Sequence, residues 1–212
     1  MGVRHPDPPE RRDLSLAQPR GLPQRHVNAS PAPTPTNPRD RALLWFAEGC
    51  GSGRLRPAPG TWGSLAGVIW TLLLLAFPRP WIYVAGIVLS IPVAIVVCTA
   101  AERILGRHDP SSVVLDEIVA MPIAFGGYAV HWAVGTGQMP GWSDARLWWP
   151  FMAGAFVLFR VFDVWKPWPI RRLQRLPGGV GVVVDDLAAA LVAAGLLWSV
   201  PLLMFWYRLA RG

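Results

Sequence analysis

The chain has 212 residues, of which 52% are hydrophobic and 16% charged, and its mean hydropathy of +0.34 favours a membrane protein over a cytosolic one. The formal net charge of +7 does not indicate nucleic acid as a partner, because nine of the 20 basic residues precede residue 57 and no basic stripe alternates with aromatic residues. The two cysteines, one of them inside an apolar run, argue against a disulfide framework.

The N-terminal segment, residues 1–40, is rich in proline and arginine and has hardly any large apolar side chains. Such a segment cannot bury enough apolar surface to offset the entropy lost on ordering. We therefore predict a disordered, basic, proline-rich cytoplasmic tail over residues 1–40 and a helical membrane domain over residues 41–212. A short amphipathic segment at about residues 42–48 is predicted to lie on the membrane surface.

Five nearly charge-free stretches follow the tail, and several reach the roughly 20 residues that a spanning helix needs. We predict spanning helices at about 62–78, 81–101, 113–134, 147–165 and 183–207. The first is short, and Pro92 should kink the second or be absorbed by neighbouring helices. The predicted fold class is therefore all-α: a polytopic membrane bundle of about five spanning helices, within a range of four to six.

The basic residues indicate which helix ends face the cytoplasm. The chain up to residue 56 and the loops at 102–117 and 166–182 carry 15 of the 20 Lys and Arg residues. The opposite side carries Arg79, Arg146, Arg208 and Arg211, and Arg160 lies inside the fourth predicted helix. The N-terminus and these two loops are therefore predicted to lie in the cytoplasm.

Four polar motifs fall on this predicted cytoplasmic side, each at the end of a different helix. They are Ala-Pro-Gly-Thr-Trp-Gly-Ser at residues 58–64, Asp-Pro-Ser-Ser-Val-Val-Leu-Asp-Glu at 109–117, Phe-Arg-Val-Phe-Asp-Val-Trp-Lys-Pro at 159–167, and Gly-Gly-Val-Gly at 178–181 followed by Asp185 and Asp186. Since they share one side of the membrane, we expect them to converge on one interface.

The acidic residues of these motifs predict a cation site. Carboxylates in a spanning helix are costly, and the nearby cations Arg160 and Lys166 cannot neutralise five of them. A divalent cation would resolve the imbalance, and oxygen ligands favour Mg²⁺ or Mn²⁺. The five carboxylates are Asp116, Glu117, Asp163, Asp185 and Asp186.

Each motif taken alone also has a structural interpretation. Arg160 and Asp163 share a helix face and could be a structural pair with Lys166 extending to the interface, or a phosphate clamp beside a metal ligand or base. Asp185 and Asp186 could cap a helix. The glycine-rich pieces could cradle phosphate or serve close helix packing.

The smaller polar residues allow the same two interpretations. Thr61 and Ser64 could bind phosphate oxygens or cap a helix, and Asp109 is best explained as an N-cap. The Cys-x-x-Gly-x-x-Arg pattern at 50–56 is typical of cysteine-dependent phosphatases, but no strand is predicted before it and prolines follow it, which argues against that chemistry.

Taken together, the four ordered motifs resemble the phosphatidylglycerophosphatase A family of bacterial membrane enzymes over roughly residues 43–200. One departure is Ala120, where the family's Gly is expected after the Asp-Glu pair, and it matters little because Ala is also small. The resemblance implies Mg²⁺-dependent hydrolysis of the terminal phosphate monoester of phosphatidylglycerophosphate at the cytoplasmic leaflet of a bacterial inner membrane. It implies nothing about oligomeric state.

Roles for individual residues follow from this chemistry as expectations. We expect metal ligands among Asp116, Asp163, Asp185 and Asp186, and catalytic carboxylates among Asp116, Glu117, Asp163 and Asp186. Either Asp163 or Glu117 would position or deprotonate the water. Substrate contacts are expected from Thr61, Ser64, Arg160, Lys166 and Gly179.

A different class of function remains open at this stage. A small transporter or channel could use buried carboxylates to pass protons or cations. That function predicts charges near the bilayer midplane, whereas the motifs place them at helix ends.

Overall fold

The computed structural model describes Gly2 and residues 37–211. The predicted tail lies outside these residues except for Gly2 and its last four positions, three of which belong to the first helix. The elements, in chain order, are α1 (Pro38–Ala47), η1 (Ser52–Arg54), α2 (Pro59–Leu75), α3 (Pro80–Leu105), α4 (Leu115–Thr136), η2 (Trp142–Asp144), α5 (Ala145–Trp165), α6 (Ile170–Leu173) and α7 (Gly179–Arg211).

The all-α prediction is confirmed, since the described residues form helices and no strand. Four segments are long and apolar enough to cross a membrane: Pro80–Leu105, Leu115–Thr136, Trp142–Trp165 and Gly179–Val200. The remaining predicted span, the first in chain order, corresponds to α2, which is apolar but has only 17 residues. The prediction named this helix as the short one, and four spans lie within the predicted range.

Proline and glycine set several of the helix ends. Pro38, Pro59 and Pro80 each occupy the first helical position, where the missing N–H breaks no hydrogen bond. Gly106 and Gly137 end α3 and α4 in the left-handed conformation, with φ of 62° and 74°. The interior Pro92 does not end α3, which continues through it.

Helix α4 lies at the centre of the bundle and packs most extensively against α7 and α2. A methyl group on Gly127 would lie 2.0 Å from the carbonyl oxygen of Ala194, so α4 and α7 cross almost in backbone contact. The core around this crossing includes Phe125, Trp148 and Phe159, all nearly inaccessible to solvent. This close packing fixes the helix ends that carry the polar motifs.

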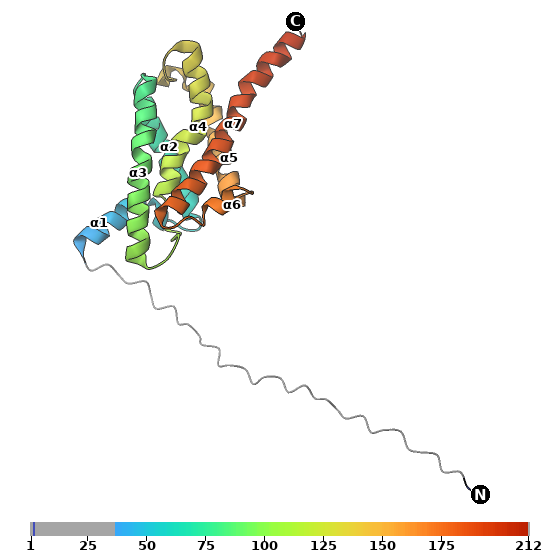
Figure 1. Ribbon diagram of the computed structural model, residues 1–212. Helices are drawn as coiled ribbons and strands as arrows, with labels where there is room; N and C mark the ends of the chain where they lie inside the picture. The colour runs from blue at the N-terminus through green and yellow to red at the C-terminus, as the bar shows by residue number, and fades with distance from the viewer. Residues whose placement is uncertain (1, 3–36, 212) are drawn as a thin grey trace. The chain divides into compact units, whose positions relative to one another are not determined.

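The two ends of the bundle are distinguished by which connections meet there. At one end, which we call the motif end, the α3–α4 loop meets α6 through a hydrogen bond from Gln174 to Asp109, and Val114 donates to the carbonyl of Ala47. Figure 1 shows α1 and α6 at this end and the connection from α4 to α5 at the other. There, Met139 donates to the carbonyl of Pro78.

Exposed tryptophans form a belt at each end. Trp149 and Trp165 of α5 are both exposed and 16 residues apart, which corresponds to about 24 Å along a helix. Tryptophan favours membrane–water interfaces, and this separation suits a hydrocarbon layer of about 30 Å. The exposed members at the motif end are Trp45, Trp62, Trp165 and Trp168, and those at the other end are Trp81, Trp142 and Trp149.

Candidate active site

The four sequence motifs meet at the motif end of the bundle. Three of them begin helices, namely α2, α4 and α7, and the third motif in chain order ends α5. Helix α5 packs against α2, α4 and α7, and ion pairs from Arg160 and Lys166 near its end reach Glu117 in the first turn of α4 and Asp185 in the second turn of α7. The helix ends that carry the motifs therefore converge, as expected.

Arg160 links α5 to α4. Its Nη1 lies 2.5 Å from Oδ2 of Asp163, one turn along the same helix, and 3.2 Å from Oε1 of Glu117. The Arg160 side chain is 19% exposed and both carboxylates are less so, which strengthens their mutual attraction relative to a surface pair. No partner within the described residues is recorded for Nη2 or Nε of Arg160.

Ser64 holds the other oxygen of the same carboxylate. Its hydroxyl, fully buried in α2, donates to Oε2 of Glu117 at 3.0 Å, and the same hydroxyl lies 2.9 Å from the carbonyl of Gly60. Glu117 is thus held from two sides, by a cation on α5 and a hydroxyl on α2. Of the predicted substrate contacts, Ser64 and Arg160 are the two that the structure joins directly to a carboxylate of α4.

Lys166, the only lysine of the chain, links α5 to α7. Its Nζ lies 2.5 Å from Oδ2 of Asp185 and 3.8 Å from Oδ1 of Asp163. The residue ends α5 with φ of 42°, a left-handed conformation that is uncommon outside glycine and that occurs often at functional sites. Burial lowers the pKa of Lys166, but the hydrogen bond to Asp185 and the surrounding carboxylates outweigh it and raise the pKa above its ordinary value. Lys166 is therefore a cation at physiological pH.

Of the five predicted carboxylates, all of which lie among the described residues, Asp116 and Asp186 are the two without a cationic partner. Both are buried, at 6% and 3% exposure, and Oδ1 of Asp116 and Oδ2 of Asp186 have no hydrogen-bond partner. Asp116 and Asp186 belong to α4 and α7, the two helices that pack most extensively against each other, and like charges buried at the same end of these helices repel each other. A buried anionic oxygen without a partner is costly, and a bound cation would remove that cost.

The carboxylates of the cluster are ligands that suit a hard divalent cation, but the distances between them are too long to enclose one. Oxygen ligands of this kind suit Mg²⁺. In the part of the chain that the structure describes, no three His, Cys, Asp or Glu side chains lie close enough together to enclose an ion as they stand. The two unpartnered oxygens of Asp116 and Asp186 are the ones open to an ion, since Asp163 and Asp185 are paired with Arg160 and Lys166.

Two glycines of α2 let the helix approach the cluster. A methyl group on Gly60 would lie 2.3 Å from Oε1 of Glu117 and 2.8 Å from Nη1 of Arg160. One on Gly63 would lie 2.5 Å from Cβ of Val114. Gly60 was not singled out from the sequence, although its neighbours were, and its place in the Ala-Pro-Gly-Thr-Trp-Gly-Ser motif was the available signal.

Thr61 and Gly179 lie at the margins of the cluster. Thr61 lines a groove beside Arg160. The amide of Gly179 donates to Oγ1 of Thr99 at 3.0 Å, and a methyl group on Gly179 would lie 2.5 Å from the backbone nitrogen of Thr99. The structure thus gives Gly179 a packing role against α3, and its predicted contact with substrate stays a prediction.

Two weaker sequence signals have structural explanations. Asp109 does not cap α4; its carboxylate accepts from Gln174 and its amide donates to Glu102, so it holds the α3–α4 loop. Cys50 lies in an irregular turn between α1 and η1, and none of the described residues forms the preceding strand that a cysteine-dependent phosphatase requires.

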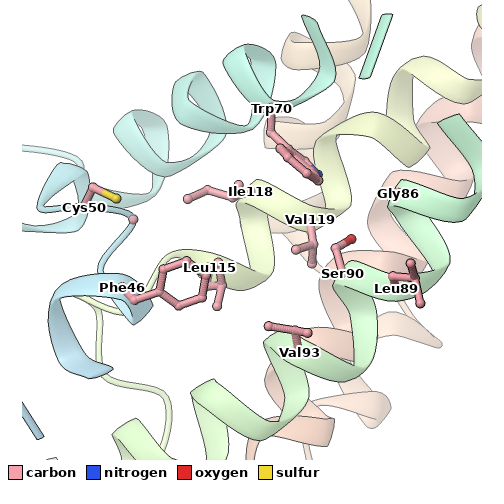
Figure 2. A pocket seen from close by; sticks show the side chains of 11 residues that line it. Phe46, Cys50, Trp70, Gly86, Leu89, Ser90, Val93, Leu115, Ile118 and Val119 are labelled. Carbon is pink, nitrogen blue, oxygen red and sulfur yellow. The ribbon is translucent and has the colours of Figure 1, made fainter. Parts of the chain in front are cut away.

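An apolar cavity of about 480 Å³ lies away from the cluster, among α1, α2, α3 and α4. Figure 2 shows the side chains around it, including Phe46, Trp70, Val93 and Ile118, and no charged side chain lines it. The chemistry-bearing groups therefore do not face this cavity.

Comparisons with known proteins agree with the motifs. The chain matches the family model described as Phosphatidylglycerophosphatase A over residues 45–201. It is 35% identical over 158 residues to the Phosphatidylglycerophosphatase A of Escherichia coli K12, covering 73% of this chain and 81% of that protein. The Haemophilus influenzae protein of the same name is 35% identical over 156 residues, covering 73% and 86%. A Bacteroides thetaiotaomicron protein provisionally named as a phosphatidylinositol-3-phosphatase is 37% identical over 145 residues, covering 66% and 82%. No solved structure is significantly similar to the chain.

Proposed function

Because the chain belongs to the phosphatidylglycerophosphatase A family, we propose that it hydrolyses the terminal phosphate monoester of phosphatidylglycerophosphate to phosphatidylglycerol and phosphate. The observation that carries the proposal is the linked cluster at the motif end, where Arg160 and Lys166 tie together carboxylates from α4, α5 and α7. Cations there suit a phosphate, and carboxylates suit a water nucleophile.

We further propose Mg²⁺ as the cofactor, held first by Asp116 and Asp186. Their unpartnered oxygens support this assignment. Asp163 and Asp185, which both contact Lys166, are the proposed additional ligands. The chemistry that such an ion supplies when bound is charge neutralisation at phosphate oxygens and a more acidic coordinated water.

The residues of the chain then divide the work of the reaction. Nη2 and Nε of Arg160 are open to phosphate oxygens, while Nη1 holds the two carboxylates in place. Glu117 or Asp163 takes a proton from water as the water oxygen attacks phosphorus. The ester P–O bond breaks, the lipid oxygen takes up a proton and leaves as an alcohol, and phosphate is released.

The cytoplasmic face is the proposed location of this site. The segments at the motif end carry most of the basic residues, which favours the cytoplasmic side in a bacterial inner membrane. A transporter or channel is the alternative, and it calls for charges near the bilayer midplane. The carboxylates instead lie in the first turn of α4, in the last turn of α5 and at the seventh and eighth residues of α7.

Phosphate release from purified protein tests the function. Wild-type protein with Mg²⁺ is expected to release phosphate from phosphatidylglycerophosphate in detergent micelles and to stop when EDTA removes the metal. Asp116→Asn, Asp163→Asn and Asp186→Asn are each expected to abolish release while the protein stays folded in the membrane fraction. Asp144→Asn, at the opposite end of the bundle, is the matched control and keeps the wild-type rate. Wild-type turnover from all three site variants would refute the assignment, and undiminished turnover in EDTA would refute the cofactor.

A further inference from the structure

A groove runs along the lipid-facing side of the site, between α2 and α5. Its volume is about 730 Å³, and it is lined by Thr61 of α2 and by Phe156, Val157, Arg160, Val161 and Val164 of α5, with Trp165 at its end. The apolar residues from Phe156 to Val164 extend about 12 Å along the helix. The apolar lining lies on both sides of Arg160: Phe156 and Val157 lie about one turn deeper in the bundle, and Val161 and Val164 lie between Arg160 and Trp165.

We propose that this groove binds an acyl chain of the substrate lipid and admits the lipid sideways from the bilayer to the catalytic cluster. The inference rests on the proposed function, because it assigns the apolar part of the same substrate. It explains how a headgroup can reach side chains that are mostly buried, since Arg160 belongs both to the groove and to the cluster with Glu117 and Asp163.

Charge complementarity favours a phosphate-bearing lipid over any other apolar occupant. In the residues lining the groove, Arg160 is the single charged side chain, and its Nη2 and Nε have no recorded partner. Thr61 adds a hydroxyl beside it. A phosphate at this point would meet a guanidinium fork and a donor while its chain lies against valines.

The position of the groove also suits the inner-leaflet lipid. Trp165, exposed at the end of α5, marks the interface, and Arg160 lies five residues further into the bundle, about 8 Å along the helix. From Arg160, Val157 and Phe156 continue the apolar wall for about 6 Å toward the middle of the bilayer. A phospholipid whose phosphate lies at Arg160 would therefore place the first part of its acyl chain against Val157 and Phe156.

The cavity of Figure 2 is the competing location for an acyl chain. It is more enclosed and has no charged side chain, but α4 presents Leu115, Ile118 and Val119 to it while the carboxylate of Glu117 points to α2 and α5. A chain bound there would have its headgroup separated from Arg160 by the α2–α4 contact. The two locations thus predict different mutational sensitivities.

Three identical exchanges separate the possibilities. Val157 lines the groove, Val93 lines the cavity of Figure 2, and Val88 lines neither; all are exposed, at 56%, 49% and 58%. Each is replaced by tryptophan, and kcat/KM is measured for dioleoyl phosphatidylglycerophosphate in micelles and for its deacylated, water-soluble headgroup. Val157→Trp is expected to lower the ratio of kcat/KM for the lipid to kcat/KM for the headgroup about tenfold, because the indole would occupy the space of the acyl chain. Val88→Trp and Val93→Trp are expected to keep the wild-type ratio.

Other outcomes overturn the proposal. A wild-type ratio for Val157→Trp, or an equal loss on both substrates, removes the groove as a chain site. A fall in the ratio for Val93→Trp places the chain in the other cavity.

A second measurement does not depend on turnover, so it separates failure of the groove from failure of the proposed function. A phosphatidic acid with a photoreactive diazirine in mid-chain is irradiated with the wild-type protein and the adducts are mapped by mass spectrometry. Adducts concentrated at residues 156–164 and reduced by excess phosphatidylglycerophosphate support the groove. Adducts spread evenly over lipid-facing residues, Val88 included, show bulk lipid only and overturn the proposal. Absence of phosphate release with groove adducts present would instead refute the function and leave a lipid-binding groove.

Discussion

Removal of the Lys166 ammonium should destabilise the protein more than removal of the negative charge of its partner Asp185. Lys166→Met leaves the carboxylate of Asp185, with a side chain only 1% exposed, without a cation. Asp185→Asn leaves Lys166 with Asp163 at 3.8 Å. The asymmetry follows because an unpaired buried charge is penalised, whereas Lys166 keeps a second partner.

The magnitude follows from the geometry. At 2.5 Å, two unit charges attract by about 7 kcal/mol at an effective dielectric constant of about 20, and desolvation offsets much of this. Breaking a buried pair from one side costs about 3–5 kcal/mol, and the lower value applies because Lys166 is 23% exposed. We therefore expect a loss of about 3 kcal/mol for Lys166→Met and about 1–2 kcal/mol for Asp185→Asn.

The double variant provides the decisive measurement. Unfolding free energies in mixed micelles, from reversible SDS titration, should show Lys166→Met with Asp185→Asn losing about 2 kcal/mol less than the sum of the single losses. Arg107→Met, at an exposed arginine of the α3–α4 loop with no recorded ion pair, is the control for loss of a cation at the same end. Strictly additive losses, or a Lys166→Met protein as stable as the control, would refute the link between α5 and α7.

Three further predictions concern the same end of the bundle. Asp116→Asn should raise the melting temperature of EDTA-treated protein, because it relieves repulsion around an unpartnered carboxylate. The variant should also lose the increase in melting temperature that Mg²⁺ gives the wild type. An increase with Mg²⁺ equal to that of the wild type would contradict the ligand assignment. Gly60→Ala should lower kcat/KM at least about tenfold, because its methyl group would lie 2.3 Å from Oε1 of Glu117, whereas Gly126→Ala, with open space around it, should keep the wild-type rate. Folding raises the pKa of Lys166, so the stabilising contribution of its ammonium is complete below the ordinary lysine pKa. The difference in unfolding free energy between wild type and Lys166→Met should therefore be constant from about pH 7 to 10 and shrink only at higher pH. A decline already between pH 7 and 9 would show that the ammonium is not held as described.

The helices and their common polar end could be predicted because both depend on patterns local to the chain. Charge-free runs located α3, α4, α5 and α7, and counting successive spans assigned the four motifs to one side. The pairing of Arg160 with Asp163 was also accessible, since residues three apart share a helix face. These inferences needed only helix geometry and the orientation of consecutive spans.

The contacts between helices could not be predicted, because they depend on how each helix is rotated about its axis. Nothing in the spacing indicates that Lys166 meets Asp185 or that Arg160 reaches Glu117. The fifth spanning helix was predicted to begin at about residue 183, yet α7 begins at Gly179, although glycine disfavours helices. Packing against the backbone of Thr99, where a side chain would not fit, outweighs that propensity.

The charge balance of the cluster explains why no single motif identified the site. Arg160 and Lys166 each pair with carboxylates from two helices, so these ion pairs hold the helices together as well as supplying charge for chemistry. What packing leaves unexplained is the remainder, namely the buried oxygens of Asp116 and Asp186 on two different helices. That remainder exists only when α4 and α7 are brought together, and it needs positive charge from outside the chain. A function that supplies both a cation and a phosphate to this point accounts for the two unpartnered oxygens and for the open donors of Arg160 at once.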